Sequence, residues 1–356
     1  MQTQNTERII PKVRYHPSIQ TPANGGQTRT RSSRAQRTRP AHEHPPEASL
    51  KAVQENPQVD PEPTARKPSK KPVQGAATDP AQVSDRAPLS PEQVPVGVAV
   101  RLDRCVVEQV EVLTRGQRTN QDWFSWRKNR ITASMAHRIS NCHFVNGKSR
   151  TPPTSYLAAI TGEGRSIQTR AMTWGVQMEA EVVRRYQRLK SAALGRSVSV
   201  LDCGLFIDDQ RAWLAASPDG IVTDSRTGEW LLCLEVKCPY KHRHRRVEDA
   251  CRDDRAFCLE IQDEEGRQPG RSPFYRLKTS HSYFTQIQCQ LAVTGLQRAD
   301  LVVFTLKETA IVPVMFDPDL WEETVSRLEV FYRDAVLPHL REKTQQQPAA
   351  AWSPEL

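Results

Sequence analysis

The first hundred residues contain neither tryptophan nor phenylalanine, and Tyr15 is their single aromatic residue. They also hold 15 of the 26 prolines in the chain. A stretch of this composition cannot bury enough apolar surface to offset the entropy of ordering its backbone. We therefore expect residues 1–100 to be a disordered, proline-rich basic tail. The same composition argument leaves 101–343 as one globular domain and 344–356 as a second disordered tail.

Other absences narrow the protein class. The eight cysteines form no CxxC pair, which argues against a zinc ribbon or an iron–sulfur cluster. No apolar run approaches the roughly 20 residues needed to span a bilayer, and the N-terminus lacks the apolar core of a signal peptide. We therefore expect an intracellular protein, located in the nucleus, with reduced thiols and no membrane partner.

The charge balance is basic, with a formal net charge of +9. Residues 1–100 hold 14 Lys/Arg against 9 Asp/Glu, so they contribute +5 and the remainder contributes +4. A basic chain favours polyanionic partners such as DNA. One cluster in the tail fits a phosphate-binding arm, a nuclear import signal or a merely solvated segment: Arg29, Arg31, Arg34, Arg37 and Arg39.

The order of periodic segments predicts an α/β fold around one mixed sheet. Helices are expected over about 101–115, from 122, over 174–189 and 281–294, and from 318 to 336. Strands are expected over about 198–207, 212–216, 230–237, 300–306 and 309–316. Residues 241–275 are polar and are expected to be irregular, with a short helix around 247–256.

Three ionisable residues in two motifs suggest a catalytic centre. Asp219 lies in the turn-like Ser217-Pro-Asp-Gly220, and sixteen residues later a mainly apolar strand ends in Glu235-Val236-Lys237. Residues two apart on a strand share a face, so Glu235 and Lys237 project together. Two charges on such a strand cost stability unless they are paired or bind an ion. A hairpin that adds Asp219 would create a site for Mg²⁺ or Mn²⁺, which prefer hard oxygen ligands.

Each motif alone has a simpler interpretation. Glu-x-Lys on a strand can be an ion pair at a sheet edge, and Pro-Asp-Gly can be only a turn. Their order, their hairpin spacing and a preceding helix that carries Glu179 favour the catalytic interpretation. Such a metal site suits phosphodiester hydrolysis, because the metal polarises the phosphate and acidifies a bound water.

Five motifs occur in order along the chain: Trp126–Ser134, Trp174–Glu179, Trp213–Gly220, Leu234–Tyr240 and His281–Leu291. With these motifs the chain resembles the YqaJ/lambda-exonuclease type of viral recombinase, within the PD-(D/E)XK nuclease superfamily, over about 120–340. The resemblance implies a restriction-endonuclease-like core, in which helices flank a mixed central β-sheet.

The resemblance also implies roles for the acidic motifs. Asp219, Glu235 and the backbone carbonyl of Val236 would be metal ligands. Lys237 would position or activate the attacking water. Glu179 would bind a metal-coordinated water or a second ion; the alternative is an exposed position on a solvated helix face.

Further residues would contact the substrate. Gln286 and Tyr283 lie one helical turn apart, and by resemblance Gln286 supports the metal site and the phosphate, unless Tyr283 is simply part of the core. By resemblance, Arg130 and Ser134 would bind phosphate at the 5′ end; a surface arginine beside a helix-starting serine is the alternative.

The basic run Lys241-His-Arg-His-Arg-Arg246 follows the strand directly. We expect Lys241 and Arg243 to contact phosphate, and we prefer a basic surface to a histidine metal site.

The resulting expectation is a magnesium-dependent DNA exonuclease, acting 5′ to 3′ on double-stranded ends in recombination or repair. The direction and a homotrimeric assembly are implied by the resemblance alone. An endonuclease of the same superfamily, a catalytically silent DNA-binding relative and a passive core behind a DNA-binding tail are the alternatives.

Overall fold

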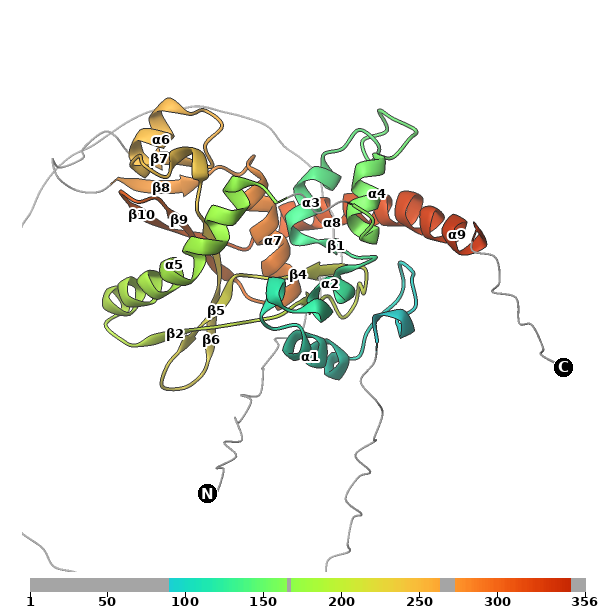
Figure 1. Ribbon diagram of the computed structural model, residues 1–356, viewed down its shortest axis with the longest axis horizontal. Helices are drawn as coiled ribbons and strands as arrows, with labels where there is room; N and C mark the ends of the chain where they lie inside the picture. The colour runs from blue at the N-terminus through green and yellow to red at the C-terminus, as the bar shows by residue number, and fades with distance from the viewer. Residues whose placement is uncertain (1–89, 165–167, 263–272, 347–356) are drawn as a thin grey trace, which may run out of the picture. The chain divides into compact units, whose positions relative to one another are not determined.

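The computed structural model describes residues 90–164, 168–262 and 273–346 (Figure 1). The predicted tail over 1–89 and the last ten residues lie outside them. Residues 90–100, which composition assigned to the tail, belong to the domain, because Val94 is buried beside Trp123 in an apolar cluster. The last helix, α9 (Leu337–Gln346), likewise continues past the predicted end at 343. Composition averaged over a long stretch cannot detect one anchoring valine.

A five-stranded mixed sheet forms the centre of the fold, as the sequence predicted. Its strand order is β10-β9-β6-β5-β2, and only the β6–β9 pair is parallel. The expected fold class, a mixed sheet flanked by helices, is therefore confirmed. The strands are β2 (Val198–Leu201), β5 (Gly220–Asp224), β6 (Trp230–Lys237), β9 (Arg298–Phe304) and β10 (Thr309–Met315).

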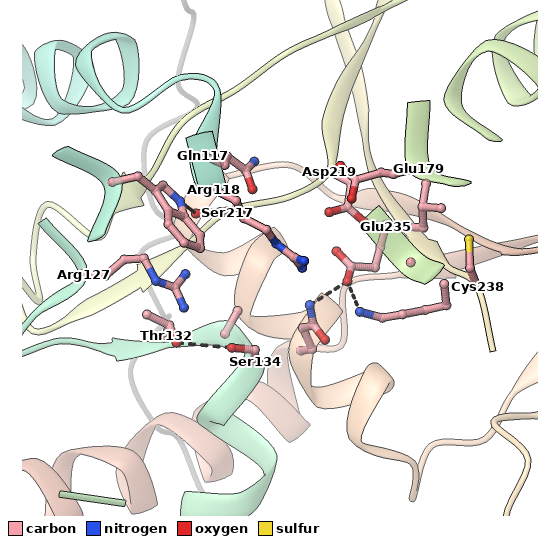
Figure 2. A pocket seen from close by; sticks show the side chains of 16 residues that line it. Gln117, Arg118, Arg127, Thr132, Ser134, Glu179, Ser217, Asp219, Glu235 and Cys238 are labelled. Atoms are coloured by element: carbon pink, nitrogen blue, oxygen red, sulfur yellow. Dashed lines mark hydrogen bonds and ion pairs between the residues drawn. The ribbon is translucent and has the colours of Figure 1, made fainter. Parts of the chain in front are cut away.

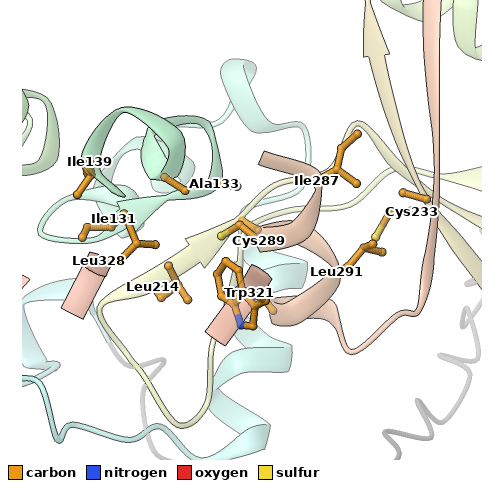
Figure 3. Packing of buried hydrophobic residues seen from close by; sticks show 14 of the residues in the cluster. Ile131, Ala133, Ile139, Leu214, Cys233, Ile287, Cys289, Leu291, Trp321 and Leu328 are labelled. Atoms are coloured by element: carbon orange, nitrogen blue, oxygen red, sulfur yellow. The ribbon is translucent and has the colours of Figure 1, made fainter. Parts of the chain in front are cut away.

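Alternation along β6 sends its side chains to two different helices. Leu234 and Val236 pack with residues of α5 (Arg170–Leu194) in one apolar cluster. Cys233 belongs to another cluster, together with Ile287 and Leu291 of α7 (Ser282–Thr294) (Figure 3). Because strand side chains alternate with a period of two, Glu235 and Lys237 lie on the α7 side of the sheet.

A smaller sheet packs beside the first, with the order β1-β4-β3. Strand β4 (Leu214–Ala216) leads directly through Asp219 into β5 of the central sheet. The Pro-Asp-Gly motif therefore joins the two sheets. The other elements here are β1 (Ile131–Thr132), β3 (Phe206–Ile207), α1 (Arg104–Leu113), α2 (Gln121–Arg127), α3 (Ala133–Ser140) and α8 (Pro318–Phe331).

The close approach of another strand, rather than a turn, requires a glycine at position 220. A Cβ at this position would lie 2.5 Å from Val200 Cγ1 and 3.2 Å from Leu201 O, so glycine allows β2 to approach closely. The Asp219 backbone N–H already donates to Leu234 O at 3.0 Å. The motif is therefore the start of a paired strand, which fixes the Asp219 backbone against β6.

The segment after β6 is more regular than expected. The predicted short helix is present as α6 (Val247–Asp253), but β7 (Leu259–Gln262) and β8 (Phe274–Leu277) pair as an antiparallel ribbon in a region expected to be irregular. Helix α4 (Thr154–Thr161) was not anticipated. Short turns lie at η1 (Pro91–Gln93), η2 (Gln117–Thr119), η3 (Tyr240–His242) and η4 (Tyr332–Val336). Across the described part of the chain, no helix is long and apolar enough to cross a membrane.

Candidate active site

A pocket of about 190 Å³ brings together residues from both sheets and their helices (Figure 2). All five residues predicted to be catalytic line it: Glu179 from α5, Asp219 before β5, Glu235 and Lys237 from β6, and Gln286 from α7. Val236 and Ser134 also line it. Segments more than a hundred residues apart in sequence thus meet at one place.

The Glu235 carboxylate is held at both oxygens, although it is only 2% exposed. Lys237 Nζ lies 2.5 Å from Oε1, and Gln286 Nε2 donates to the same oxygen at 2.6 Å. Gln290 Nε2 donates to Oε2, also at 2.6 Å. Sequence reasoning missed Gln290, although it follows Gln286 by four residues and so shares its face of α7.

Asp219 lies against the same strand. Its Oδ2 accepts a hydrogen bond from the Val236 backbone N–H at 2.7 Å. Burial raises the pKa of Asp219 well above its usual range, and the neighbouring charges of Glu235 and Glu179 raise it further, against the opposing effect of Lys237. Burial also raises the pKa of Glu179. Three carboxylates therefore lie together on one side of the pocket.

Lys237 stays protonated in this environment. Burial alone lowers its pKa, but Glu235 and Asp219 outweigh burial and hold the pKa above its ordinary value. The ring of Tyr283 covers the ammonium, with its centroid 4.7 Å from Nζ. Tyr283 is not among the residues that line the pocket. Its ring therefore lies beside the lysine, and its expected phosphate contact stays a prediction.

The donor set fits a hydrated divalent cation. Burial raises the pKa of Asp219 and Glu179, and the charges of neighbouring carboxylates raise it further; a cation between them would relieve that repulsion. Among the described residues, no three His, Cys, Asp or Glu side chains gather closely enough to enclose a metal ion. An open site suits Mg²⁺, which keeps several waters and takes one or two carboxylates, better than it suits a closed zinc site.

The opposite side of the pocket is basic. Arg118 extends between the carboxylates and Arg127 in Figure 2. Arg127 stacks on Trp123, with Cζ 3.9 Å from the ring centroid, and burial lowers its pKa to about 10, with a further contribution from Arg118. Sequence reasoning missed both arginines. The spacing of Trp123 and Arg127 by four residues on α2 was the available signal.

Arg130, the arginine that sequence reasoning chose, lies elsewhere. It is 5% exposed, and its Nη1 donates to Trp126 O at 2.8 Å and to Lys128 O at 3.3 Å. It does not line the pocket, whereas Ser134 does. Ser134 therefore shares the pocket lining with Arg127 and not with Arg130. Sequence spacing could not distinguish the two arginines, because both lie within seven residues of Ser134.

The basic run after β6 also lies outside the pocket lining. Lys241 Nζ pairs with Asp254 Oδ2 at 2.7 Å, and His242 Nε2 lies 2.9 Å from the same oxygen. Arg243 stacks on Tyr240, with Cζ 3.9 Å from the ring centroid. These contacts hold the basic run against Asp254 and Tyr240. The buried His242 side chain pairs with Asp254 and so has a structural role.

The N-terminal helices clamp the Asp219 segment. Gln117 Nε2 donates to Pro218 O at 2.8 Å and to Cys203 O at 3.0 Å. Trp123 Nε1 donates to Ser217 Oγ at 2.9 Å. The segment around η2 and α2 thus both supplies the arginines and holds the backbone before Asp219.

Comparison with known proteins places the chain in a family. Residues 122–297 match the family model of the YqaJ-like viral recombinase domain, and this part of the chain belongs to that family. The alkaline nuclease of Autographa californica nuclear polyhedrosis virus is 27% identical over 231 residues, which cover 63% of this chain and 50% of the viral protein. The chain thus spans about half the length of this curated relative.

Two solved structures are also similar. An alkaline exonuclease from Laribacter hongkongensis is 21% identical, with 64% of this chain and 98% of that chain covered and a TM-score of 0.41. The Shutoff and Exonuclease Protein from Kaposi's sarcoma-associated herpesvirus is 14% identical, with 67% and 74% covered and a TM-score of 0.41.

The raised pKa of Asp219 predicts a pH-dependent stability. Because the folded-state pKa lies above the unfolded value of about 3.9, the stability from the protonated carboxyl is present in acid and is lost as pH rises. Without divalent metal at pH 8, Asp219→Asn should therefore raise the free energy of unfolding by roughly 1–2 kcal/mol. Urea unfolding in EDTA at pH 8 and pH 5 measures this, and the gain should shrink at pH 5. The exposed Asp209→Asn is the control, and an equal gain at both pH values contradicts the prediction.

Proposed function

We propose that this chain is a metal-dependent deoxyribonuclease, and specifically an exonuclease that degrades double-stranded DNA ends from 5′ to 3′ in recombination or repair. The observation that carries the proposal is the two-sided pocket. Glu179, Asp219 and Glu235 line one side, and Arg118 and Arg127 line the other. A phosphodiester needs a cation site on one flank and anion-binding groups on the other, and the two sides match these needs.

The carboxylate side would hold the metal. Asp219, Glu235 and the Val236 carbonyl are the proposed ligands of Mg²⁺ or Mn²⁺, and Glu179 would hold a coordinated water or a second ion. Such an ion would polarise the phosphate and lower the pKa of a water bound to it. Because Gln286 and Gln290 fix both oxygens of Glu235, its carboxylate needs little reorganisation when the substrate binds.

Lys237 would act as a cation and hydrogen-bond donor. Its raised pKa means that it enters the reaction protonated, so it orients the attacking water and offsets the charge that develops on the phosphate. The Tyr283 ring restricts the ammonium to this position.

The basic side would bind the phosphate next to the scissile one. The guanidinium of Arg127 offers a fork of donors suited to phosphate, and Ser134 adds a hydroxyl. We therefore assign to Arg127 the role that sequence reasoning gave to Arg130. The choice of the 5′ end follows the family resemblance, as does a homotrimer.

Two other functions give different results in the same assays. An endonuclease of the same superfamily would cut closed circular DNA. A silent DNA-binding relative would need no complete set of Asp219, Glu235 and Lys237, and all three are present. The name of the viral relative, an alkaline nuclease, also favours an active enzyme.

Removing the central charges should abolish hydrolysis. Asp219→Asn and Lys237→Met should each lower kcat on linear duplex DNA with Mg²⁺ by at least about 100-fold, because one loses a metal ligand and the other the compensating cation. Release of nucleotides from linear and closed circular DNA is measured in parallel. The exposed Lys307→Ala is the control. A wild type that degrades neither DNA, or variants that retain full activity, would overturn the nuclease proposal.

Arg127 and Arg130 should behave differently when replaced by alanine. Arg127→Ala should raise KM for ends with a 5′-phosphate by about 10- to 100-fold, with little change for 5′-hydroxyl ends, because charge-assisted hydrogen bonds to phosphate are lost. Arg130→Ala should instead lower the free energy of unfolding by roughly 1–3 kcal/mol, since it removes the donor to buried carbonyls. Steady-state kinetics on both kinds of DNA end and urea unfolding of both variants measure these effects. The assignment is wrong if Arg130→Ala raises KM for 5′-phosphate ends while Arg127→Ala only lowers stability.

Gln290 should act as a positioning residue. It is fully buried and its Oε1 has no hydrogen-bond partner, a cost that its bond to Glu235 offsets. Gln290→Met should lower kcat per folded molecule about tenfold and leave KM nearly unchanged. It should also lower the free energy of unfolding by roughly 1–3 kcal/mol, because the buried Glu235 Oε2 loses its donor. Gln288→Met is the matched control: Gln288 bonds to Met315 O and to the Asp317 N–H, so its loss should lower stability while kcat per folded molecule is retained. Equal effects on kcat would exclude the positioning role.

A further inference from the structure

One continuous segment of the chain lacks acidic residues. Between Asp122 and Glu163 there are 40 residues with six Lys/Arg and no Asp or Glu. Residues 101–356 hold 36 Lys/Arg and 32 Asp/Glu, a net charge of +4, so without this segment they would carry −2. This segment, which runs from α2 to the end of α4, is therefore basic along its whole length. Arg127 places one of these six charges in the catalytic pocket, and the other five have no role in the proposed hydrolysis.

An open cavity of about 540 Å³ lies within this segment. It is lined by the second half of α3, the connection that follows it and the start of α4, and no acidic residue is among the described residues that line it. Its size lies in the range of sites that hold small organic ligands. The residues that carry the argument are His137, Arg138, Asn141, Phe144 and Tyr156.

The cavity combines a guanidinium with rigid aromatic rings. Arg138 Cζ lies 4.8 Å from the Tyr156 ring centroid. The rings of Phe144 and Tyr156 both pack on Phe331 of the core, at centroid distances of 5.8 Å and 6.4 Å. Aromatic rings held in place beside an arginine are the groups that bind bases and phosphates of single-stranded nucleic acids.

Helix α3 connects this cavity to the pocket. Ser134 lines the pocket, whereas Arg138 and Asn141 line the cavity. All three are exposed and are spaced by four and three residues, so they form one stripe on the helix. The rise of an α-helix places Arg138 about 6 Å and Asn141 about 10 Å beyond Ser134. That distance corresponds to one or two nucleotides of an extended strand.

We propose that the cavity beside α3 is a second nucleotide-binding site, which holds single-stranded DNA one or two nucleotides away from the catalytic pocket. The inference rests on the proposed nuclease function for its substrate, but the binding site is defined independently of hydrolysis. Arg138 contacts a phosphate, and a base stacks against the platform of Tyr156 and Phe144. The site adds contacts to the DNA strand outside the catalytic pocket and includes none of the proposed metal ligands.

The test is equilibrium binding of fluorescent oligothymidylates to the full chain in Ca²⁺ or EDTA, followed by fluorescence anisotropy. Arg138→Ala should weaken binding of a 20-mer about tenfold and lower the salt dependence by about one phosphate contact. Arg138→Lys should restore the salt dependence but not the full affinity. Tyr156→Leu keeps an apolar contact with the core and should also weaken binding of the 20-mer. Arg327→Ala on α8 is the charge-matched control.

Kinetics separate this proposal from the proposed function. The p-nitrophenyl ester of thymidine 5′-phosphate reaches only the catalytic pocket, so Arg138→Ala should hydrolyse it like wild type while KM for long DNA rises. If wild type hydrolyses neither substrate but Arg138→Ala still weakens the 20-mer, the nuclease function fails and the binding site stands. If Arg138→Ala binds the 20-mer like wild type, the binding site is refuted whatever the activity. An effect on blunt duplex alone, or displacement of the 20-mer by poly-glutamate as effectively as by DNA, would also refute it.

Discussion

The buried carboxylate of Glu235 is the constraint on which the site depends. A charge at this depth is tolerated only because an ammonium and two amides surround it, at distances between 2.5 and 2.6 Å. The amides come from α7, so the helix must pack on the face of β6 that carries Glu235. The apolar contacts of Ile287 and Leu291 with that face set this packing. The packing of α7 on β6 thus buries the apolar side chains and also brings the two amides that compensate the charge of Glu235.

The second constraint is electrostatic and extends across the whole pocket. Burial and the charges of Glu235 and Glu179 raise the pKa of Asp219 on one side, and burial and the nearby Arg118 lower the pKa of Arg127 on the other. Each side by itself is under repulsion. A bound metal ion would relieve the repulsion among the carboxylates. The phosphate of a bound phosphodiester would relieve the repulsion between the arginines. The acid-free segment beside α3 continues the basic side away from the pocket, where a longer strand would lie.

Several elements followed from the sequence because their physical cause is local. The alternation in β6 predicted that Glu235 and Lys237 share a face, and the apolar stripe from Trp174 predicted α5. The hairpin that brings Asp219 beside them was inferred from spacing. Other features depend on neighbours distant in sequence. Arg127 and Arg130 have similar surroundings in the sequence, yet one faces the pocket and the other bonds to buried carbonyls. Gly220 looks like a turn residue but is required by the approach of β2.

The sequence by itself determined the fold class, the order of the motifs and the identity of the central charges, because each depends on periodicity or on residues a few positions apart. Only the tertiary structure decided which arginine faces the carboxylates, that Gln290 holds the second oxygen of Glu235, and that Val94 belongs to the domain. These depend on packing between elements that are far apart along the chain. The cavity beside α3 belongs to the same group, since the charge pattern is visible in the sequence but the hollow and its aromatic wall exist only once α3, α4 and Phe331 meet.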